Sequence, residues 1–161
     1  MRLTSMTDFA LRLLMYLTQQ QQEQQRQGEP ERLCTIAEVA RFHDISEAHL
    51  MKVTHQLGLQ GFVETVRGKG GGLRLARAPA EINLGAVVRG MEADFRIAEC
   101  FASDGQCVLI GACRLATVLD EALSRFLVHL DGHTLADIVP DRMATVNGAA
   151  AVRRVEWLDR R

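Results

Sequence analysis

Three of the four cysteines in the chain lie within fourteen residues, at Cys100, Cys107 and Cys113. Their spacing is C-x6-C-x5-C, and Gly105 and Gly111 lie between them. Thiolates bind zinc, iron–sulfur clusters and other soft metals. A structural zinc site usually pairs cysteines about two to four residues apart, and the intervals here are longer. The segment therefore fits three ligands of a cluster, with a fourth from elsewhere, better than a lone zinc ion.

The chemistry expected of these thiols depends on whether the protein lies in a reducing or an oxidising compartment. The chain has 161 residues, 47% of them hydrophobic, so we expect one globular unit with an apolar core. We recognise no export signal and no run of about 18 apolar residues that would cross a membrane. We therefore expect a soluble cytoplasmic protein, in which cysteines stay reduced. Cys34 lies far from the other three, and we expect an ordinary half-buried thiol there.

A second group of residues suits contact with DNA. Thr35 and Glu38 form a capping-box pattern that opens a short helix, and Ser46 can cap another. Two short helices joined by a tight turn predict a helix-turn-helix. The second helix of this motif presents its N-terminal residues to base edges in the major groove. We expect Ser46, His49 and Lys52 to make these contacts.

The residues after Gly61 change from a helical period to a β-hairpin. The stretch "FVETVRGKGGGLRLAR" reads as two strands joined by a glycine-rich turn, which carries Arg67 and Lys69. A hairpin directly after a helix-turn-helix is a wing, and two cations at its tip suit phosphates or a minor groove. The first 80 residues carry 10 Lys and Arg against 8 Asp and Glu, a weak signal in the same direction.

The remaining elements must position these two groups. We expect a first helix from Thr4 or Ser5, with Asp8 in its first turn and Arg12 paired to it four residues on. The glutamine-rich residues 19–32 are predicted to be a frayed helix end and loop, or else a longer helix. Asn83 can cap a further helix.

The longest helical pattern runs from Ala112 to His129. Its apolar stripe is too wide for a small winged domain to cover, so we predict that it packs on the same helix of a second chain. The predicted fold is mainly α, a winged helix-turn-helix with a long C-terminal dimerisation helix. Its parts are a DNA-binding domain over 1–80, the cysteine loop and dimerisation helix over 81–139, and a tail over 140–161.

Together these segments resemble a known family. "LTSMTDFALRLLMYL", "TIAEVARFHDISEAHLMKVTHQLGLQGFVETVRGKGGGLRLA", the three-cysteine loop and "CRLATVLDEALSRFL" are similar to the winged-helix iron–sulfur transcriptional repressors, and most of all to their nitric-oxide-sensing members. The likeness covers residues 1 to about 139. The wing and the cysteine loop are its most specific parts.

The resemblance implies a homodimer that binds a double-stranded DNA operator and holds one iron–sulfur cluster per subunit. The cluster is expected to be [4Fe-4S], with [2Fe-2S] as the alternative. Its implied ligands are Cys100, Cys107 and Cys113, with Asp8 of the other subunit as the fourth. Some relatives use a histidine three residues after the last cysteine, where this chain has Ala116. Between its first two cysteines the loop is slightly longer than in the family members it resembles, so Asp104 or Glu99 could compete for the fourth position.

We therefore predict a repressor that responds to nitric oxide, and not an enzyme. No catalytic Ser/His/Asp or Cys/His arrangement and no phosphate-binding loop can be assembled from the sequence. Three alternatives stay open. One is a DNA-binding regulator with zinc or thiol chemistry at the cysteines. The others are a small redox enzyme with an accidental helix-turn-helix pattern and a cluster-free repressor that binds a metabolite.

Overall fold

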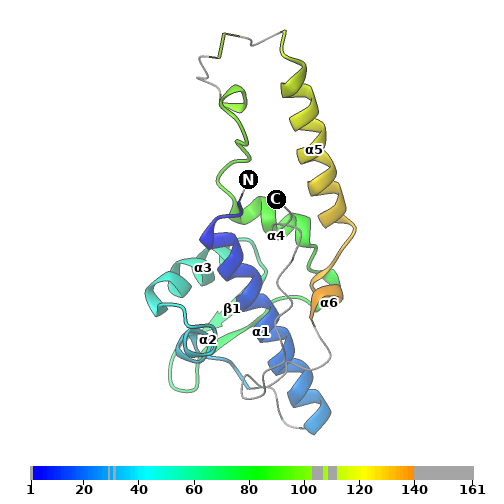
Figure 1. The fold of residues 1–161 in the computed structure, drawn as a ribbon. Helices are drawn as coiled ribbons and strands as arrows, with labels where there is room; N and C mark the ends of the chain where they lie inside the picture. Colours follow the sequence, from blue (N-terminus) through cyan, green and yellow to red (C-terminus); the bar gives the residue numbers. More distant parts are fainter. Residues whose placement is uncertain (1, 29, 31, 103–106, 109–111, 140–161) are drawn as a thin grey trace, which may run out of the picture.

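The computed structural model describes residues 2–28, 30, 32–102, 107–108 and 112–139. Within these ranges the fold is mainly α with one small antiparallel sheet, as predicted, and Figure 1 shows its arrangement. The predicted tail over 140–161 lies outside the described residues. The elements, with 3-10 turns at Pro79–Glu81 and Glu99–Phe101, are α1 Ser5–Gln27, α2 Ile36–His43, α3 Glu47–Leu59, β1 Val63–Val66, β2 Gly72–Leu75, α4 Leu84–Met91, α5 Arg114–Asp131 and α6 Leu135–Ile138.

Helix α1 is longer than the expected loop over 19–32 allows. It starts at the predicted Thr4 cap and continues through the glutamine run to Gln27, where Gly28 ends it in a left-handed conformation. The loop prediction was wrong for residues 19–27, and the longer helix left open as its alternative is confirmed. The cause is tertiary: Gln24 is only 8% exposed, and its amide exchanges two hydrogen bonds with the backbone of Arg32.

The helix-turn-helix forms from the caps that the sequence predicts. Thr35 and Glu38 make the capping box of α2, and Ser46 caps α3 through the backbone N–H of His49. Between the helices Asp44 adopts a left-handed conformation that closes the turn. The two helices pack with α1 around one apolar core, whose fully buried members include Leu13, Leu14, Val39, Leu50, Val53 and Leu57.

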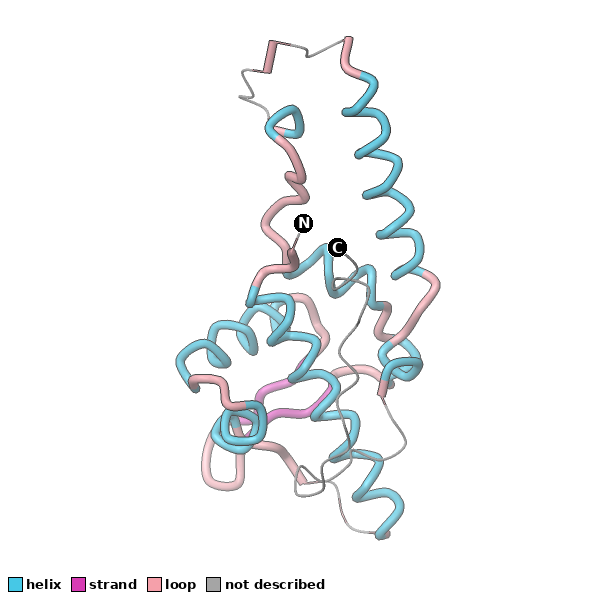
Figure 2. Tube along the Cα trace, in the orientation of Figure 1, coloured by secondary structure: helices cyan, strands magenta, loops and turns pink. Residues whose placement is uncertain are grey.

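The wing is a two-stranded antiparallel sheet. Its register runs from Val63 opposite Leu75 to Val66 opposite Gly72. One face enters the core through Val63 and Leu73, and the Cys34 backbone extends the sheet by a bridge to Leu73. The tube in Figure 2 shows this small sheet lying among the helices.

Helix α5 rises away from the winged core, and residues 93–102 extend from the end of α4 in the same general direction (Figures 1 and 2). None of its side chains is fully buried, and Leu115 and Val118 are 61% and 60% exposed. At its other end Asp131 forms a bidentate ion pair with Arg89 of α4, at 2.5 and 2.7 Å. The helix is therefore fixed at its C-terminal end, and its apolar stripe is open in a single subunit. No described helix is long and apolar enough to cross a membrane.

Candidate functional site

Helix α3 presents one exposed face next to its capped N-terminus. Ser46, His49 and Lys52 are all exposed, whereas Leu50 and Val53 point into the core. The Ser46 hydroxyl accepts a hydrogen bond from the His49 N–H at 3.3 Å, and its own O–H stays able to donate. Three side chains that can bond to base edges or phosphates therefore follow the surface of one short helix.

A groove of about 310 Å³ separates this face of α3 from the start of α1. The His49 ring lies 6.1 Å from the Phe9 ring, centroid to centroid, across the groove. Its lining residues are Ser5, Met6, Phe9, His49, Lys52 and Val53. The N-terminal turns of α1 therefore form one wall of the groove beside the exposed face of α3.

The tip of the wing carries its charge on a turn that depends on glycine. Gly68 and Gly70 have φ values of +101° and +80°, which side chains with a Cβ rarely adopt. Arg67 and Lys69 are exposed on this turn, and within the described chain neither has an acidic partner. Further down the hairpin, Arg74 pairs with Glu64 at 2.8 Å across the strands. Positive charge is thus concentrated at the tip.

The cysteine segment holds three free, partly exposed thiols. Cys100 lies in the 3-10 turn Glu99–Phe101, and Cys113 directly precedes α5. Across the described ranges, no three potential metal ligands from His, Cys, Asp and Glu come together in the single chain. Glu99 is exposed beside Cys100, and Asp104, the other competing ligand, lies outside the described residues. The structure therefore places the three cysteines along one segment without assembling a complete site.

Asp8 lies in the first turn of α1 and forms the predicted pair with Arg12, at 3.0 Å. The Arg12 Nε also donates to the Asp8 carboxylate at 3.1 Å. Both side chains are nearly half exposed, so the carboxylate is accessible from outside the subunit. It is not gathered with the described cysteines of its own chain.

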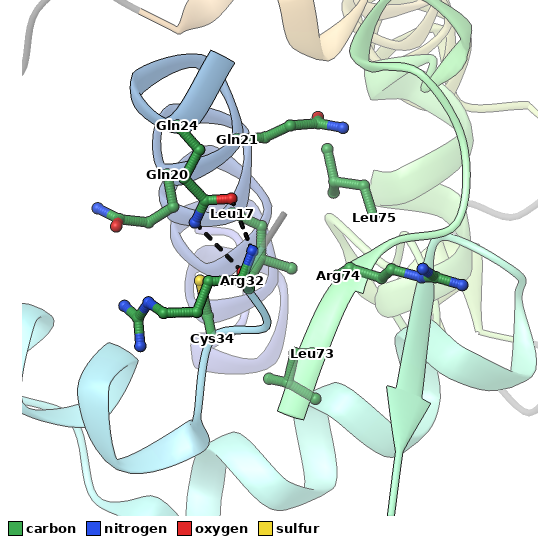
Figure 3. Close-up of a pocket in the computed structure, with 9 residues that line it drawn as sticks. All are labelled: Leu17, Gln20, Gln21, Gln24, Arg32, Cys34, Leu73, Arg74 and Leu75. Atoms are coloured by element: carbon green, nitrogen blue, oxygen red, sulfur yellow. Dashed lines mark hydrogen bonds between the residues drawn. The ribbon is translucent and has the colours of Figure 1, made fainter. Parts of the chain in front are cut away.

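Cys34 differs from the other three thiols. It is 2% exposed, more deeply buried than predicted, because its backbone bridges to Leu73 and draws it beneath α1. Burial raises the pKa of its thiol to about 11. Figure 3 shows it among Leu17, Leu73 and the glutamine side chains of α1, next to a cavity of about 10 Å³ that leaves no room for a ligand.

Sequence reasoning missed Glu92, which follows α4 and begins the cysteine segment. One carboxylate oxygen of Glu92 accepts three hydrogen bonds from the start of α1. The donors are the Thr4 N–H at 2.8 Å, the Thr4 hydroxyl at 3.2 Å and the Thr7 hydroxyl at 2.5 Å. The partners are 85 and 88 residues apart, and no local pattern relates them.

Comparisons with known proteins agree on one family. Residues 3–141 match the Rrf2 model, described as "Iron-dependent Transcriptional regulator". Proteins named "HTH-type transcriptional regulator NsrR" from Geobacillus kaustophilus and Bacillus subtilis are each 46% identical over 143 residues, covering 88% of this chain and 92% of theirs. "Protein aau3" of Rhizobium meliloti is 41% identical over 143 residues, covering 88% and 87%.

Solved structures support the same fold. The chain superposes on T. potens IscR with a TM-score of 0.66 and 22% identity, covering 90% of this chain and 93% of that one. It superposes on CymR (YrzC), the global cysteine regulator of B. subtilis, with a TM-score of 0.65 and 18% identity, covering 86% and 96%. The family model, the relatives and the winged helix-turn-helix agree: this chain belongs to the Rrf2 family and is a transcriptional regulator, not an enzyme.

Proposed function

We propose that this regulator is a homodimeric repressor that senses nitric oxide through an iron–sulfur cluster held by Cys100, Cys107 and Cys113. The observation that carries the proposal is the contrast among its four thiols. Three lie partly exposed on one segment between α4 and α5, while the fourth is buried and hard to ionise. The resemblance to nitric-oxide-sensing repressors and the relatives named NsrR support the same function.

The donor set fits a cluster. Three thiolates suit iron, and an accessible carboxylate at Asp8 of the partner subunit would complete the set. We favour [4Fe-4S] over [2Fe-2S], on the resemblance alone. When bound, such a cluster would supply iron that reacts with nitric oxide.

The presence or absence of the cluster would change the affinity for DNA through the residues of this chain. Cysteines from one subunit and Asp8 from the other would hold the two chains in one relative position. Since α1 packs directly on α3, that position would set the separation of the two α3 helices. Dimeric helix-turn-helix proteins bind half-sites at a fixed spacing, so a change in this separation would weaken operator binding.

We expect the second subunit to pack on the exposed apolar stripe of α5. The stripe on α5 leaves Leu115 and Val118 mostly exposed, and the described part of the subunit has no element that covers them. A second α5 would cover both stripes at once, because a two-fold interface uses the same surface from each chain. This arrangement would also bring each cysteine segment toward the other subunit.

The experiment is an anaerobic purification followed by absorption spectroscopy and counting of iron and acid-labile sulfide. We expect visible absorption with about three to four irons per chain for a [4Fe-4S] cluster. Addition of nitric oxide should abolish both the absorption and the affinity for a duplex selected by the protein from a random pool. A colourless protein with one zinc per chain would instead establish the zinc or thiol switch. No metal at all, after reconstitution with iron and sulfide, would favour the cluster-free repressor.

A further inference from the structure

We infer that the C-terminal end of α4, residues 89–91 with the cap residue Glu92, couples the cysteine segment to α1 and α3, with Glu92 and Gln60 as the positioning residues. The inference rests on the proposed function, and it assigns the route by which a change at the cysteines reaches α3. Three interactions meet within these four residues, and each leads to a different element.

The first interaction joins the cysteine segment to α1. Glu92 takes three hydrogen bonds on one oxygen, from the Thr4 N–H, the Thr4 hydroxyl and the Thr7 hydroxyl. Hydrogen bonds to an ionised carboxylate are stronger than those between neutral groups. The Thr4 hydroxyl also caps α1 through the Thr7 N–H, so Glu92 orients the cap itself. Movement of the segment at Glu92 must therefore move or release the first turn of α1.

The second interaction joins α4 to α3. Gln60 is the C-terminal cap residue of α3, and its side-chain N–H donates to the Gly90 carbonyl at 2.5 Å. Gly90 makes this approach possible, because a Cβ built at this position would collide with the Gln60 side-chain amide. The end of the recognition helix is thus attached to the same turn that holds α1.

The third interaction joins this turn to α5. Arg89 donates two parallel hydrogen bonds to the Asp131 carboxylate. Asp131 also packs against Gly85, which lies on α4 one turn before Arg89. The segment that carries the cysteines is therefore anchored at its start by Glu92, whereas its finish at Cys113 joins the N-terminal end of α5, one helix length away from Asp131. A change in the path of that segment therefore acts at its anchored start, at Glu92, and is passed from there to α1 and α3.

The test compares two states of the full-length dimer, with cluster bound and after removal by nitric oxide. The quantity measured is the ratio of the two affinities for the selected duplex, which is the coupling between sites. The variants are Glu92→Ala, which loses the acceptor, and Glu92→Gln, which keeps an oxygen there. The matched control is Asp94→Ala, since Asp94 is an exposed carboxylate on the same segment that pairs with its neighbour Arg96.

We expect Glu92→Ala to lower the affinity ratio by about tenfold, within the usual range of such couplings. Cluster content should be retained. Glu92→Gln should recover much of the ratio, and Asp94→Ala should match the unsubstituted protein. A second readout needs no cluster: hydrogen exchange in the first turn of α1 should speed up in cluster-free Glu92→Ala and not in Asp94→Ala.

The attachment to α3 has an independent test. Gln60→Ala removes the donor, and Gly90→Ala pushes the Gln60 side chain aside while favouring the helix. Both should lower the affinity ratio, and the double variant should lower it no further than either alone, because all three break the same hydrogen bond. Gly90→Ala also guards against simple misfolding, since it should not lower the melting temperature.

The outcomes are separable. A cluster-loaded Glu92→Ala protein with an unchanged affinity ratio overturns the inference and leaves the proposed function intact. So does additivity of Gln60→Ala and Gly90→Ala. Failure of the unsubstituted protein to take up iron and sulfide overturns both together, because no second state would then exist to be coupled.

Discussion

At the scale of single residues, the four thiols divide into two chemical groups. Cys34 is buried under α1, and its raised pKa keeps it protonated at neutral pH. The other three are partly exposed at positions that no packed core constrains. Since the thiolate is the nucleophile and the ligand, exposure decides which cysteines react.

We predict that cluster-free protein at pH 8 consumes three equivalents of an alkylating reagent quickly and the fourth only on unfolding. With a pKa of about 11, only about one Cys34 in a thousand is ionised at pH 8. Because burial raises this pKa, the ionised fraction of Cys34 should rise about tenfold per pH unit and level off only above pH 11. Intact-mass spectrometry counts the adducts, and Cys34→Ser should lose the slow one alone. Rapid modification of Cys34 at pH 8 would contradict the assignment.

The role of Asp8 as a ligand can be tested by substitution with alanine. Asp8→Ala removes an exposed ion pair with Arg12, so the free energy of unfolding should change by less than about 1 kcal/mol. If Asp8 of the partner subunit is a ligand, the variant should lose its visible absorption several-fold faster on exposure to nitric oxide. Stopped-flow absorption gives the rate. Arg12→Ala breaks the same pair but keeps the carboxylate, and it should retain the cluster; equal rates for all three proteins would exclude Asp8 as a ligand.

At the scale of elements, we predict that α3 and the wing play different parts in binding DNA. The exposed face of α3 carries hydrogen-bonding side chains, whereas the tip of the wing carries two cations on a glycine turn. Side chains at base edges confer specificity, and cations at phosphates confer affinity that depends on salt.

Arg67→Ala with Lys69→Ala should therefore weaken binding to every duplex alike. The slope of log affinity against log salt should fall in magnitude by about 2, one for each phosphate that no longer meets a cation. Fluorescence anisotropy at several salt concentrations measures the slope. Arg125→Ala removes a cation from α5, far along the chain from the wing, and should leave the slope unchanged. An unaltered slope in the double variant would remove the wing from the interface.

Local contacts within these elements can be predicted from the sequence, whereas contacts between distant residues cannot. Thr35, Ser46 and Asn83 are local signals, and each caps a helix where predicted because its partner lies three residues away. The glutamine run carries no such signal, and its helix depends on an interaction between Gln24 and Arg32. Glu92 was unpredictable for the same reason, since its partners on α1 are more than eighty residues distant. The three cysteines were recognisable, but their mutual arrangement depends on tertiary structure and ligand.

At the scale of the whole molecule, the apolar stripe on α5 is exposed in a single subunit, with Leu115 and Val118 more than half exposed. We predict that Val118→Asp dissociates the dimer, because it would bury a charge within the proposed interface. Val128 is 67% exposed but falls off the stripe, since ten residues turn a helix by about 280°. Val128→Asp is therefore the matched control and should stay dimeric in analytical ultracentrifugation. A dimeric Val118→Asp would place the interface elsewhere.

If two α5 helices form the dimer interface, the number of chains in the cell becomes part of the signal. If the partner covers the stripe and completes the ligand set, then the sensor exists only above the concentration at which two chains meet. Dilution would act in the same direction as nitric oxide, since each separates the contributions of the two subunits. A repressor that controlled its own synthesis would then hold its copy number near this threshold, where a small loss of dimers changes operator occupancy most.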